Sequence, residues 1–313
     1  MYRRGLTPPS KNTMRDPLIS ICIPAYKADR FLAETLDSVR AQTFTAWEMI
    51  VTEDGSRDRT EAIVTAFAAT VPQRVRYMRH DPNRGLPATR NAGIAAAETP
   101  WIAFLDSDDL WTADHLAIAH TTALGTGADF IHAGSILFDS DSGRELEKRA
   151  PSPDLCQSLP VSLFDARYVI QPSSVLMQRA LWEKAGKFDP AFRYVEDRDM
   201  WLRCARAGAR IVYTGHETCR YRKHGYALST HSAAMAEAAA RVFAKHLDWD
   251  AIPREVRRSF SARAWADAAR LSWRTDPRGA AIFFQRACSV RWAFNWWAHG
   301  MLCRILAVRQ RRP

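Results

Sequence analysis

The stretch WIAFLDSDDLW, residues 101–111, joins a short apolar run to three closely spaced aspartates. The run WIAFL has the length and residue types of a β-strand. Asp106, Asp108 and Asp109 follow it directly, and three ionised carboxylates this close would repel one another unless positive charge lay nearby. The stretch therefore predicts a strand that ends in a charged site.

Working outward, similar apolar strands alternate with segments whose apolar residues recur at helical spacing. Upstream, the pattern predicts strands over 18–26, 47–56 and 74–80, and helices over 29–41, 58–70 and 86–98. Downstream it predicts a helix over 113–123 and strands over 128–139, 171–177 and 209–215, with helices over 179–186 and 196–207. We expect residues 140–170 to form an irregular connection. Such alternation predicts an α/β fold with right-handed βαβ units and a mostly parallel sheet flanked by helices.

From residue 231 onward every segment has a helical pattern. The expected helices cover 231–247, 253–273, 277–290 and 292–309. The predicted organisation is therefore a basic flexible tail over 1–16, an α/β domain over 17–230, and an Arg/Trp-rich, all-helical extension over 231–313.

Polar clusters stand at the ends of three of the predicted strands. They are Pro24-Ala25-Tyr26, Glu53-Asp54-Gly55-Ser56 and Asp106-Ser107-Asp108-Asp109. Ligands of open α/β sheets bind beyond the carboxyl ends of the strands. We therefore expect these clusters to meet at one edge of the sheet.

The acidic cluster also has the chemistry of a metal site. The spacing of Asp106 and Asp108 puts both side chains on the same side of an extended segment. Carboxylate oxygens suit Mg²⁺ or Mn²⁺, and Mg²⁺ is usually held by one or two carboxylates together with substrate phosphates. The cluster thus predicts a divalent ion and a phosphorylated substrate. Acids at the start of a loop also serve as helix caps, and this alternative stays open for Asp109.

An ordered set of motifs resembles the family 2 glycosyltransferases, an inverting group with the GT-A fold. The motifs are SICIPAY (20–26), TEDGSRD (52–58), NRGLPATRNAG (83–93), FLDSDDLW (104–111), SSVLMQRALWEKAGKFDP (173–190), YVEDRDMWLR (194–203) and YRKHGYALS (221–229). The resemblance covers roughly residues 17–230, and the ordered set is far more specific than any one motif.

The resemblance implies a nucleotide-sugar donor, with its base at the first two polar clusters. Pro24, Ala25 and Tyr26 would line the base pocket, and Tyr26 would offer its ring to the base. Asp54 would accept a hydrogen bond from the base, with Glu53 as its neighbour. An ordinary aromatic residue at the end of a strand is the alternative for Tyr26.

The resemblance also implies contacts to the ribose and the diphosphate. Asp106 and Ser107 would lie at the ribose, and a metal site of Asp106, Asp108 and His224 would hold Mn²⁺ or Mg²⁺ at the diphosphate. Arg90 would contact the donor or the acidic cluster. Structural pairing with an aspartate is the alternative for Arg90, and a simple loop histidine is the alternative for His224. Residues 214–230 are a candidate lid over the donor.

Glu196 and Asp197 begin a predicted helix, where negative charge is favourable. By resemblance Asp197 matches the general base, and we group Glu196 with it as catalytic. An inverting transfer needs a base on the acceptor side, opposite the departing diphosphate. The resemblance thus implies transfer of a sugar, most readily from a UDP-sugar, to the hydroxyl of a sugar or lipid-linked acceptor. Cell-surface polysaccharide or glycolipid synthesis is the expected setting.

The net charge of +10 comes entirely from residues 251–313, which hold thirteen arginines and three acids. Several tryptophans lie among them. One interpretation is a helical appendage on the anionic inner face of a membrane. A packed helical subdomain with a solvated basic face and a dimer contact are the alternatives. No recognised nucleic-acid module accompanies the charge, so we expect no nucleic-acid partner.

The rest of the composition indicates a cytoplasmic protein. No apolar run is long enough for a membrane span, the N-terminal stretch lacks a signal-like apolar core, and the six cysteines have neither zinc nor disulfide spacing. A nucleotidyltransferase is a competing class, but IPAYKADRF (23–31) lacks the Gly-rich loop such enzymes need. A non-catalytic basic protein that binds membranes or nucleic acid is the other alternative.

Overall fold

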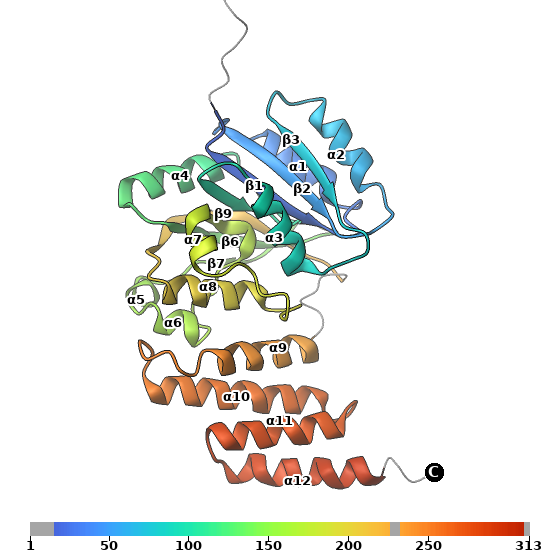
Figure 1. The fold of residues 1–313 in the computed structure, drawn as a ribbon, viewed down its shortest axis with the longest axis vertical. Helices are drawn as coiled ribbons and strands as arrows, with labels where there is room; N and C mark the ends of the chain where they lie inside the picture. Colours follow the sequence, from blue (N-terminus) through green and yellow to red (C-terminus); the bar gives the residue numbers. More distant parts are fainter. Residues whose placement is uncertain (1–15, 226–231, 310–313) are drawn as a thin grey trace, which may run out of the picture.

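The first four strands form the parallel half of a mixed sheet. The computed structural model describes residues 16–225 and 232–309. In it, β1 (Ile19–Ala25) pairs in parallel with β2 (Trp47–Glu53) on one side and β4 (Trp101–Phe104) on the other, and β3 (Val75–Arg79) lies beyond β2. The helices α1 (Leu32–Arg40), α2 (Thr60–Ala68) and α3 (Leu86–Ala96) connect these strands and cover the sheet (Figure 1). The predicted α/β fold is confirmed.

The second half of the sheet contains antiparallel pairs. Beyond β4 lie β8 (Val175–Gln178), β6 (Phe130–Asp139), β9 (Ile211–Lys223) and β5 (Leu110–Trp111), and β7 (Glu145–Arg149) pairs with β6. β8 runs antiparallel to both β4 and β6, whereas β9 runs parallel to β6. The alternation of strands and helices in the sequence did not indicate these antiparallel pairs.

Two segments differ from their predicted form. Residues 140–170 are not an irregular connection, because they contain β7 and the short helices α5 (Pro153–Gln157) and α6 (Val161–Phe164). The last predicted strand, 209–215, continues as β9 to Lys223, since Gly215 turns the chain at a φ of 81° and pairing with β6 resumes beyond it. Much of the expected lid over 214–230 is therefore strand, and residues 226–230 of it lie outside the described residues.

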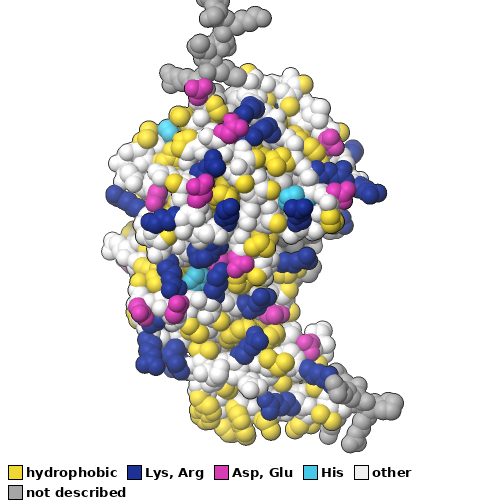
Figure 2. Space-filling view, viewed as in Figure 1, with side chains coloured by type: hydrophobic (Ala, Val, Ile, Leu, Met, Phe, Trp, Pro, Cys, Tyr) yellow, Lys and Arg dark blue, Asp and Glu magenta, His cyan; other side chains and the backbone are white. Residues whose placement is uncertain are grey.

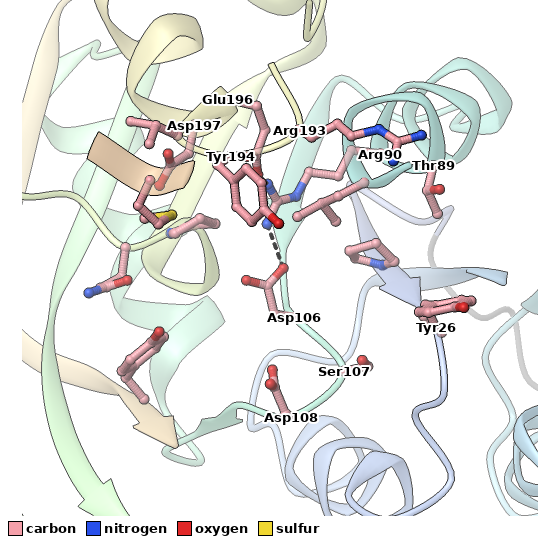
Figure 3. Close-up of a pocket in the computed structure, with 18 of the residues that line it drawn as sticks. Tyr26, Thr89, Arg90, Asp106, Ser107, Asp108, Arg193, Tyr194, Glu196 and Asp197 are labelled. Atoms are coloured by element: carbon pink, nitrogen blue, oxygen red, sulfur yellow. Dashed lines mark hydrogen bonds and ion pairs between the residues drawn. The ribbon is translucent and has the colours of Figure 1, made fainter. Parts of the chain in front are cut away.

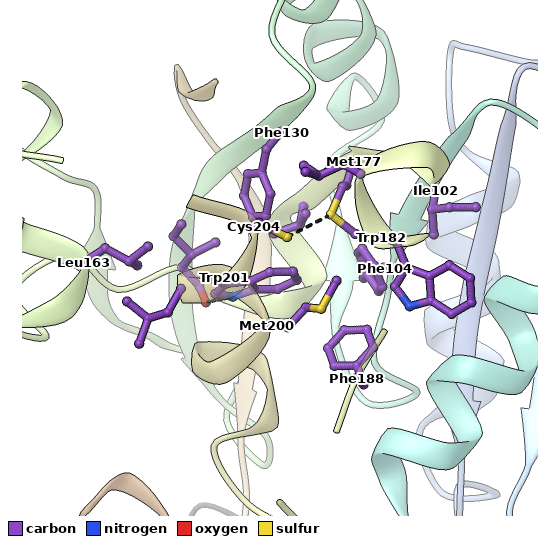
Figure 4. Close-up of a cluster of buried hydrophobic side chains, with 14 of the residues drawn as sticks. Ile102, Phe104, Phe130, Leu163, Met177, Trp182, Phe188, Met200, Trp201 and Cys204 are labelled. Carbon is purple, nitrogen blue, oxygen red and sulfur yellow. Dashed lines mark hydrogen bonds between the residues drawn. The ribbon is translucent and has the colours of Figure 1, made fainter. Parts of the chain in front are cut away.

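The remaining helices of the α/β part surround the second half of the sheet. They are α4 (His115–Thr126), α7 (Arg179–Lys184) and α8 (Glu196–Arg206), and a 3₁₀ turn, η1 (Pro172–Ser174), precedes β8. Trp201 of α8 is 1% exposed and packs edge-on against Phe104 of β4 and Phe130 of β6, with ring centroids 5.8 and 5.0 Å away (Figure 4). This aromatic cluster fixes α8 against the sheet.

The C-terminal part is a stack of four helices. α9 (Ser232–Lys245), α10 (Arg254–Ser272), α11 (Pro277–Val290) and α12 (Phe294–Arg309) follow one another in chain order below the sheet (Figure 1). Val242 and Phe243 of α9 belong to the same buried cluster as Trp201, whereas Trp265 and Phe284 belong to a separate cluster within the stack. None of the helices in the described ranges combines the length and apolar character that crossing a membrane requires.

Candidate active site

A cavity of about 1150 Å³ opens at the carboxyl ends of β1 and β4. The strand order places β2 and β3 on one side of β1 and β4 on the other, so the chain changes direction across the sheet at this point. Such a reversal leaves a crevice between neighbouring strand ends, which is where ligands of α/β sheets bind. The predicted site residues that line this cavity are Pro24, Ala25, Tyr26, Asp54, Arg90, Asp106, Ser107, Asp108, Glu196, Asp197 and His224.

Glu53 does not line the cavity. Successive side chains of a strand point to opposite faces, so Glu53 and Asp54 diverge at the end of β2. The Glu53 carboxylate accepts a hydrogen bond of 2.6 Å from the Ser56 hydroxyl and lies 3.3 Å from the Arg79 guanidinium. Its position therefore corrects the expectation of a donor contact, because Glu53 holds the turn after β2 instead.

Asp54 faces the cavity edge, but its carboxylate already has backbone partners. It accepts hydrogen bonds from the amides of Arg84 and Gly85 at 2.9 and 2.8 Å, and His80 Nδ1 lies 2.9 Å away. Gly85, at a φ of 88°, immediately precedes α3. Asp54 thus ties the end of β2 to the start of α3, where negative charge is favourable.

Tyr26 extends from the end of β1 along the cavity edge and is 50% exposed (Figure 3). Pro24 and Ala25 precede it in the buried part of the strand. A half-exposed ring beside a cavity offers one flat face for stacking while its backbone stays fixed in the sheet. The position therefore suits the predicted base contact better than the alternative of an ordinary strand-end aromatic.

The three aspartates after β4 each have a different partner. Asp106 lies 2.6 Å from the Arg90 guanidinium, and Asp108 lies 2.9 Å from His224 Nε2. Asp109 is 1% exposed, and it accepts hydrogen bonds from the Ser173 hydroxyl at 2.6 Å and the Arg222 amide at 2.9 Å. Because each carboxylate has its own hydrogen-bonding or charged partner, the repulsion among the three aspartates is reduced. Asp109 supports the turn from beneath and does not cap a helix.

Arg90 joins the acidic cluster after β4 to the start of α8. It is 2% exposed and bridges Asp106 and Glu196, with a short hydrogen bond to Glu196 (Figure 3). Burial alone would lower the pKa of Arg90, but Asp106 and Glu196 raise it above its ordinary value. We expected Arg90 to contact either the donor or the acidic cluster, and the structure shows the contact to the acidic cluster.

Burial changes the acidity of the carboxyl groups around Arg90. It raises the pKa of Glu196 to about 7 and raises the pKa of Asp106, while the positive charge of Arg90 opposes both shifts. Burial also raises the pKa of Asp109 well above its ordinary value, with a further contribution from the charge of Asp108. Arg90 therefore offsets part of the cost of ionising the buried carboxyl groups of Glu196 and Asp106.

The N-terminus of α8 presents Asp197 to the cavity. Val195, which precedes the helix, has a φ of 59°, a left-handed conformation that is unfavourable for a β-branched residue. Such strain is found at functional sites, where surrounding structure compensates for it. Asp197 is partly exposed, and its carboxylate accepts a hydrogen bond of 2.7 Å from the Arg198 amide. The turn at Val195 thus sets where this carboxylate points.

Asp108 and His224 fit a divalent ion that also binds the substrate. Asp108 is 34% exposed toward the cavity, and the His224 ring lies against it. Among the described residues there is no group of three acidic, histidine or cysteine side chains that could hold a metal by itself. Mg²⁺ and Mn²⁺ commonly take only one or two protein ligands and complete their shell with phosphate oxygens and water. Asp106 is the least suitable of the three predicted metal ligands, because its carboxylate is paired with Arg90.

The cavity also has polar residues that sequence reasoning missed. They are Lys27, Arg193, Tyr194 and Arg198. Residue type alone gives no sign of this, because these residues come from a strand end, a loop and helix α8 that only the fold brings together. Lys27 and Arg193 directly adjoin the motifs SICIPAY and YVEDRDMWLR, and Tyr194 and Arg198 lie within the second of them, so position relative to the motifs could have indicated all four. Lys223, whose place in the motif YRKHGYALS already suggested a contact to phosphate, lines the cavity beside them.

Comparisons with known proteins show which family the chain belongs to. Residues 20–184 match the family described as glycosyl transferase family 2. An uncharacterized glycosyltransferase of Rickettsia typhi is 29% identical over 210 residues, which cover 66% of this chain and 64% of that relative. The Escherichia coli protein WfgD, named as a UDP-Glc:alpha-D-GlcNAc-diphosphoundecaprenol beta-1,3-glucosyltransferase, is 31% identical over 129 residues, 41% of this chain and 50% of WfgD.

Solved structures show the same fold at low sequence identity. Residues 1–349 of S. aureus TarS superpose with a TM-score of 0.65 at 18% identity, covering 87% of this chain and 80% of that one. The mannosyltransferase PcManGT from Pyrobaculum calidifontis, solved with GDP-Man and Mn²⁺, gives 0.60 at 16% identity, covering 95% and 89%. The family match spans more than half of the chain, and the fold agrees with it. The chain therefore belongs to glycosyl transferase family 2 and has a GT-A type of fold.

Proposed function

We propose that the protein is an inverting glycosyltransferase that moves a sugar from a nucleotide-sugar, most readily a UDP-sugar, to an acceptor hydroxyl with the help of Mn²⁺ or Mg²⁺. The observation that carries this proposal is the meeting of Asp54, Asp108 and Asp197 around one cavity, although more than 140 residues separate the first from the last. Family membership supports the reaction class.

On the donor side, Tyr26 and Asp54 would hold the base and Asp108 and His224 would hold the ion at the diphosphate. A TarS structure is described as a complex with UDP-GlcNAc, and PcManGT as a complex with GDP-Man and Mn²⁺. A bound divalent ion would neutralise charge on the departing diphosphate. Lys27 and Lys223, both on the cavity wall, would add further positive charge for the phosphates.

On the acceptor side, Asp197 would act as the general base. As the acceptor oxygen forms its bond to the anomeric carbon, the bond to the diphosphate oxygen breaks and the acceptor proton passes to the Asp197 carboxylate. Attack on the face opposite the departing diphosphate inverts the anomeric centre. Glu196 would serve this step indirectly, because its contact with Arg90 fixes the first turn of α8. We therefore assign Glu196 a positioning role.

The setting we propose is the synthesis of cell-surface polysaccharide or glycolipid, with a sugar or a lipid-linked sugar as acceptor. TuaG of Bacillus subtilis, 29% identical over 193 residues, is named as a putative teichuronic acid biosynthesis glycosyltransferase. The name of WfgD specifies a diphosphoundecaprenol-linked acceptor. The name of TuaG supports the proposed setting, and the name of WfgD supports a lipid-linked acceptor for the present chain.

The test is a panel of UDP-, GDP- and dTDP-sugars, each with and without Mn²⁺, with mass spectrometry of the released nucleoside diphosphate. We expect release from a UDP-sugar only with the metal. Asp108→Ala should abolish release, and Asp114→Ala, which changes an exposed aspartate outside the cavity, should leave it intact. Absence of release from every donor, or release unaffected by Asp108→Ala, would contradict the proposal and favour a non-catalytic binding protein.

A further inference from the structure

The outermost helix of the stack, α12, has an apolar face that no described residue covers. Its exposed apolar residues are Phe294, Trp297, Met301, Leu302, Ile305 and Val308, each between 42% and 64% exposed. Figure 2 shows apolar side chains along the end of the molecule that α12 forms in Figure 1. We call this set of six residues the α12 outer face.

This face is separate from the surface that α12 uses for packing. Gly300, Cys303 and Ala307 are buried, and Cys303 belongs to the apolar cluster within the stack. At about 100° per residue, the exposed set lies on a different side of the helix from the buried one. A helix that is apolar on two sides needs cover on both of them. The terminal helix of a stacked array ordinarily has a polar outer face, so the α12 outer face indicates a partner.

The charge around this face is mainly positive, although Arg291 lies 3.4 Å from the exposed Glu255 carboxylate of α10. Residues 277–313 contain seven arginines and neither lysine nor acid. Arg291 is exposed at the turn before α12, and Arg304 is exposed on α12 itself. Trp292, 69% exposed, lies in the same turn. Tryptophan and arginine beside an apolar helical face are typical of helices that lie at a membrane interface, because the arginines reach lipid phosphates while the apolar side chains enter the acyl boundary.

We propose that the α12 outer face docks on the surface of an anionic membrane. A second copy of this chain is the competing occupant, but it would bring exposed Arg291 and Arg304 of one copy toward the same arginines of the other, which is electrostatically unfavourable. An anionic lipid surface complements both the charge and the apolar stripe.

Docking through α12 leaves the cavity accessible. α12 packs on α11, α11 on α10 and α10 on α9, and the only described residue of the stack that lines the cavity is Met235 of α9. A membrane under α12 would therefore not cover the site. The proposal does not depend on glycosyl transfer, since membrane binding is measured without donor or acceptor.

The first test is cosedimentation of the full-length protein with vesicles of phosphatidylcholine alone or mixed with phosphatidylglycerol. We expect binding only to the mixed vesicles, and weaker binding as salt increases. The double variant Trp297→Gln/Ile305→Gln should bind at least about tenfold more weakly, because two buried apolar contacts are lost. The matched control, Leu124→Gln/Leu146→Gln, changes exposed apolar residues on α4 and β7 and should bind like the wild type.

A second pair of variants tests the charge. Arg291→Gln/Arg304→Gln should weaken binding by about fivefold for each arginine removed. Arg40→Gln/Arg144→Gln, exposed arginines of the α/β part, should have no effect. All eight positions are partly or fully exposed, and equal melting temperatures would show that the variants are folded.

Three results would overturn the proposal. One is failure of the wild type to bind the mixed vesicles at low salt. Another is equal binding by Trp297→Gln/Ile305→Gln and the wild type. The third is a dimer in sedimentation velocity that Ile305→Gln dissociates, in a protein that does not bind vesicles.

Discussion

Only Ser107 separates Asp106 from Asp108, yet their surroundings give the two carboxylates different chemistry. Asp106 is a quarter exposed and paired with buried Arg90, whereas Asp108 is a third exposed and lies against His224. A carboxylate paired with a guanidinium keeps little capacity for a metal, while one beside an imidazole can share an ion with it. The residue types alone predicted an ion for both positions, and their partners favour Asp108.

Asp197→Asn should separate transfer from donor binding. The amide keeps the shape of the side chain but cannot accept the acceptor proton, so the rate of transfer should fall by about 10²–10⁴-fold. Binding of UDP with Mn²⁺ and slow donor hydrolysis should persist. Glu61→Gln, an acid in the first turn of α2, is the control and should change neither. Transfer at the wild-type rate in Asp197→Asn would remove the base assignment.

Arg90→Gln should strongly destabilise the protein. The substitution leaves Asp106 and Glu196 without their cation, and breaking a buried ion pair from one side costs about 3–5 kcal/mol. The free energy of unfolding, measured with urea, should show this loss. Arg40→Gln, which breaks an exposed pair with Asp37, should cost no more than about 1 kcal/mol. Equal losses in the two variants would show that the buried network contributes little.

At the scale of the elements, the strands that the sequence predicts well are those buried on both faces of the sheet. β1, β2 and β4 are buried along their whole length and mostly apolar because helices cover both faces of the parallel half, and so their sequence predicted them. β7, with sequence ELEKR, is almost wholly exposed and carries no apolar alternation, and it is defined by pairing with β6 alone. Pairing of this kind is a tertiary property that a single segment does not encode.

The candidate site likewise has features that the sequence predicted and features that depend on tertiary contacts. Its location was predictable because strand ends of a parallel sheet meet at one edge, which brings Tyr26, Asp54 and Asp108 together. The bridge from Arg90 to Glu196 was not predictable, because it joins two elements 106 residues apart. The diversion of Glu53 away from the cavity depends on where β2 ends, and that boundary shifts by a residue or two in any sequence-based assignment.

Gly55→Ala should damage the connection between β2 and α3. Gly55 has a φ of 79°, and a Cβ there would lie 2.8 Å from the Asn83 amide nitrogen. The variant should lose about 1–3 kcal/mol from backbone strain, with a further loss from the clash, and should bind UDP more weakly because Asp54 contacts the same loop. The control is Gly208→Ala. Gly208 has a φ of 87°, but a Cβ there would meet no atom within 4 Å, so this variant has the backbone strain without the clash. Equal stability of the two variants would contradict the role of the close approach.

Asp199 couples α8 to α9, and this coupling should depend on pH. Asp199 is fully buried, which would raise its pKa, but His246, Arg203 and Lys245 lower that pKa to about 2. A lowered carboxyl pKa gives stability above its ordinary value of 3.8, and the protein loses that stability as pH falls toward 2.

Between about pH 5 and pH 2, the wild type should therefore lose about 2 kcal/mol more free energy of unfolding than Asp199→Asn does. Asp37→Asn, in an exposed pair with Arg40, is the control and should stay close to the wild-type pH dependence. An Asp199→Asn variant with the wild-type pH dependence would show that the carboxylate is not the coupling group.

At the scale of the whole molecule, the helical stack continues the core of the α/β part and ends in a surface of different character. The first helix, α9, packs into the main core and borders the cavity through Met235. The last, α12, exposes the apolar, arginine-flanked outer face. The count of charged residues located the basic segment in the sequence. Only the fold shows that α9 borders the cavity while α12 faces outward.

The central claim is that acidic side chains from distant strands and helices form one donor site that requires a divalent ion. The most direct measurement is the melting temperature of the wild type and Asp108→Ala with UDP, with Mn²⁺, and with both. We predict that UDP and Mn²⁺ together raise the melting temperature of the wild type, that neither does so alone, and that the increase disappears in Asp108→Ala. An equal increase in Asp108→Ala, or none in the wild type at any UDP concentration, would contradict the account.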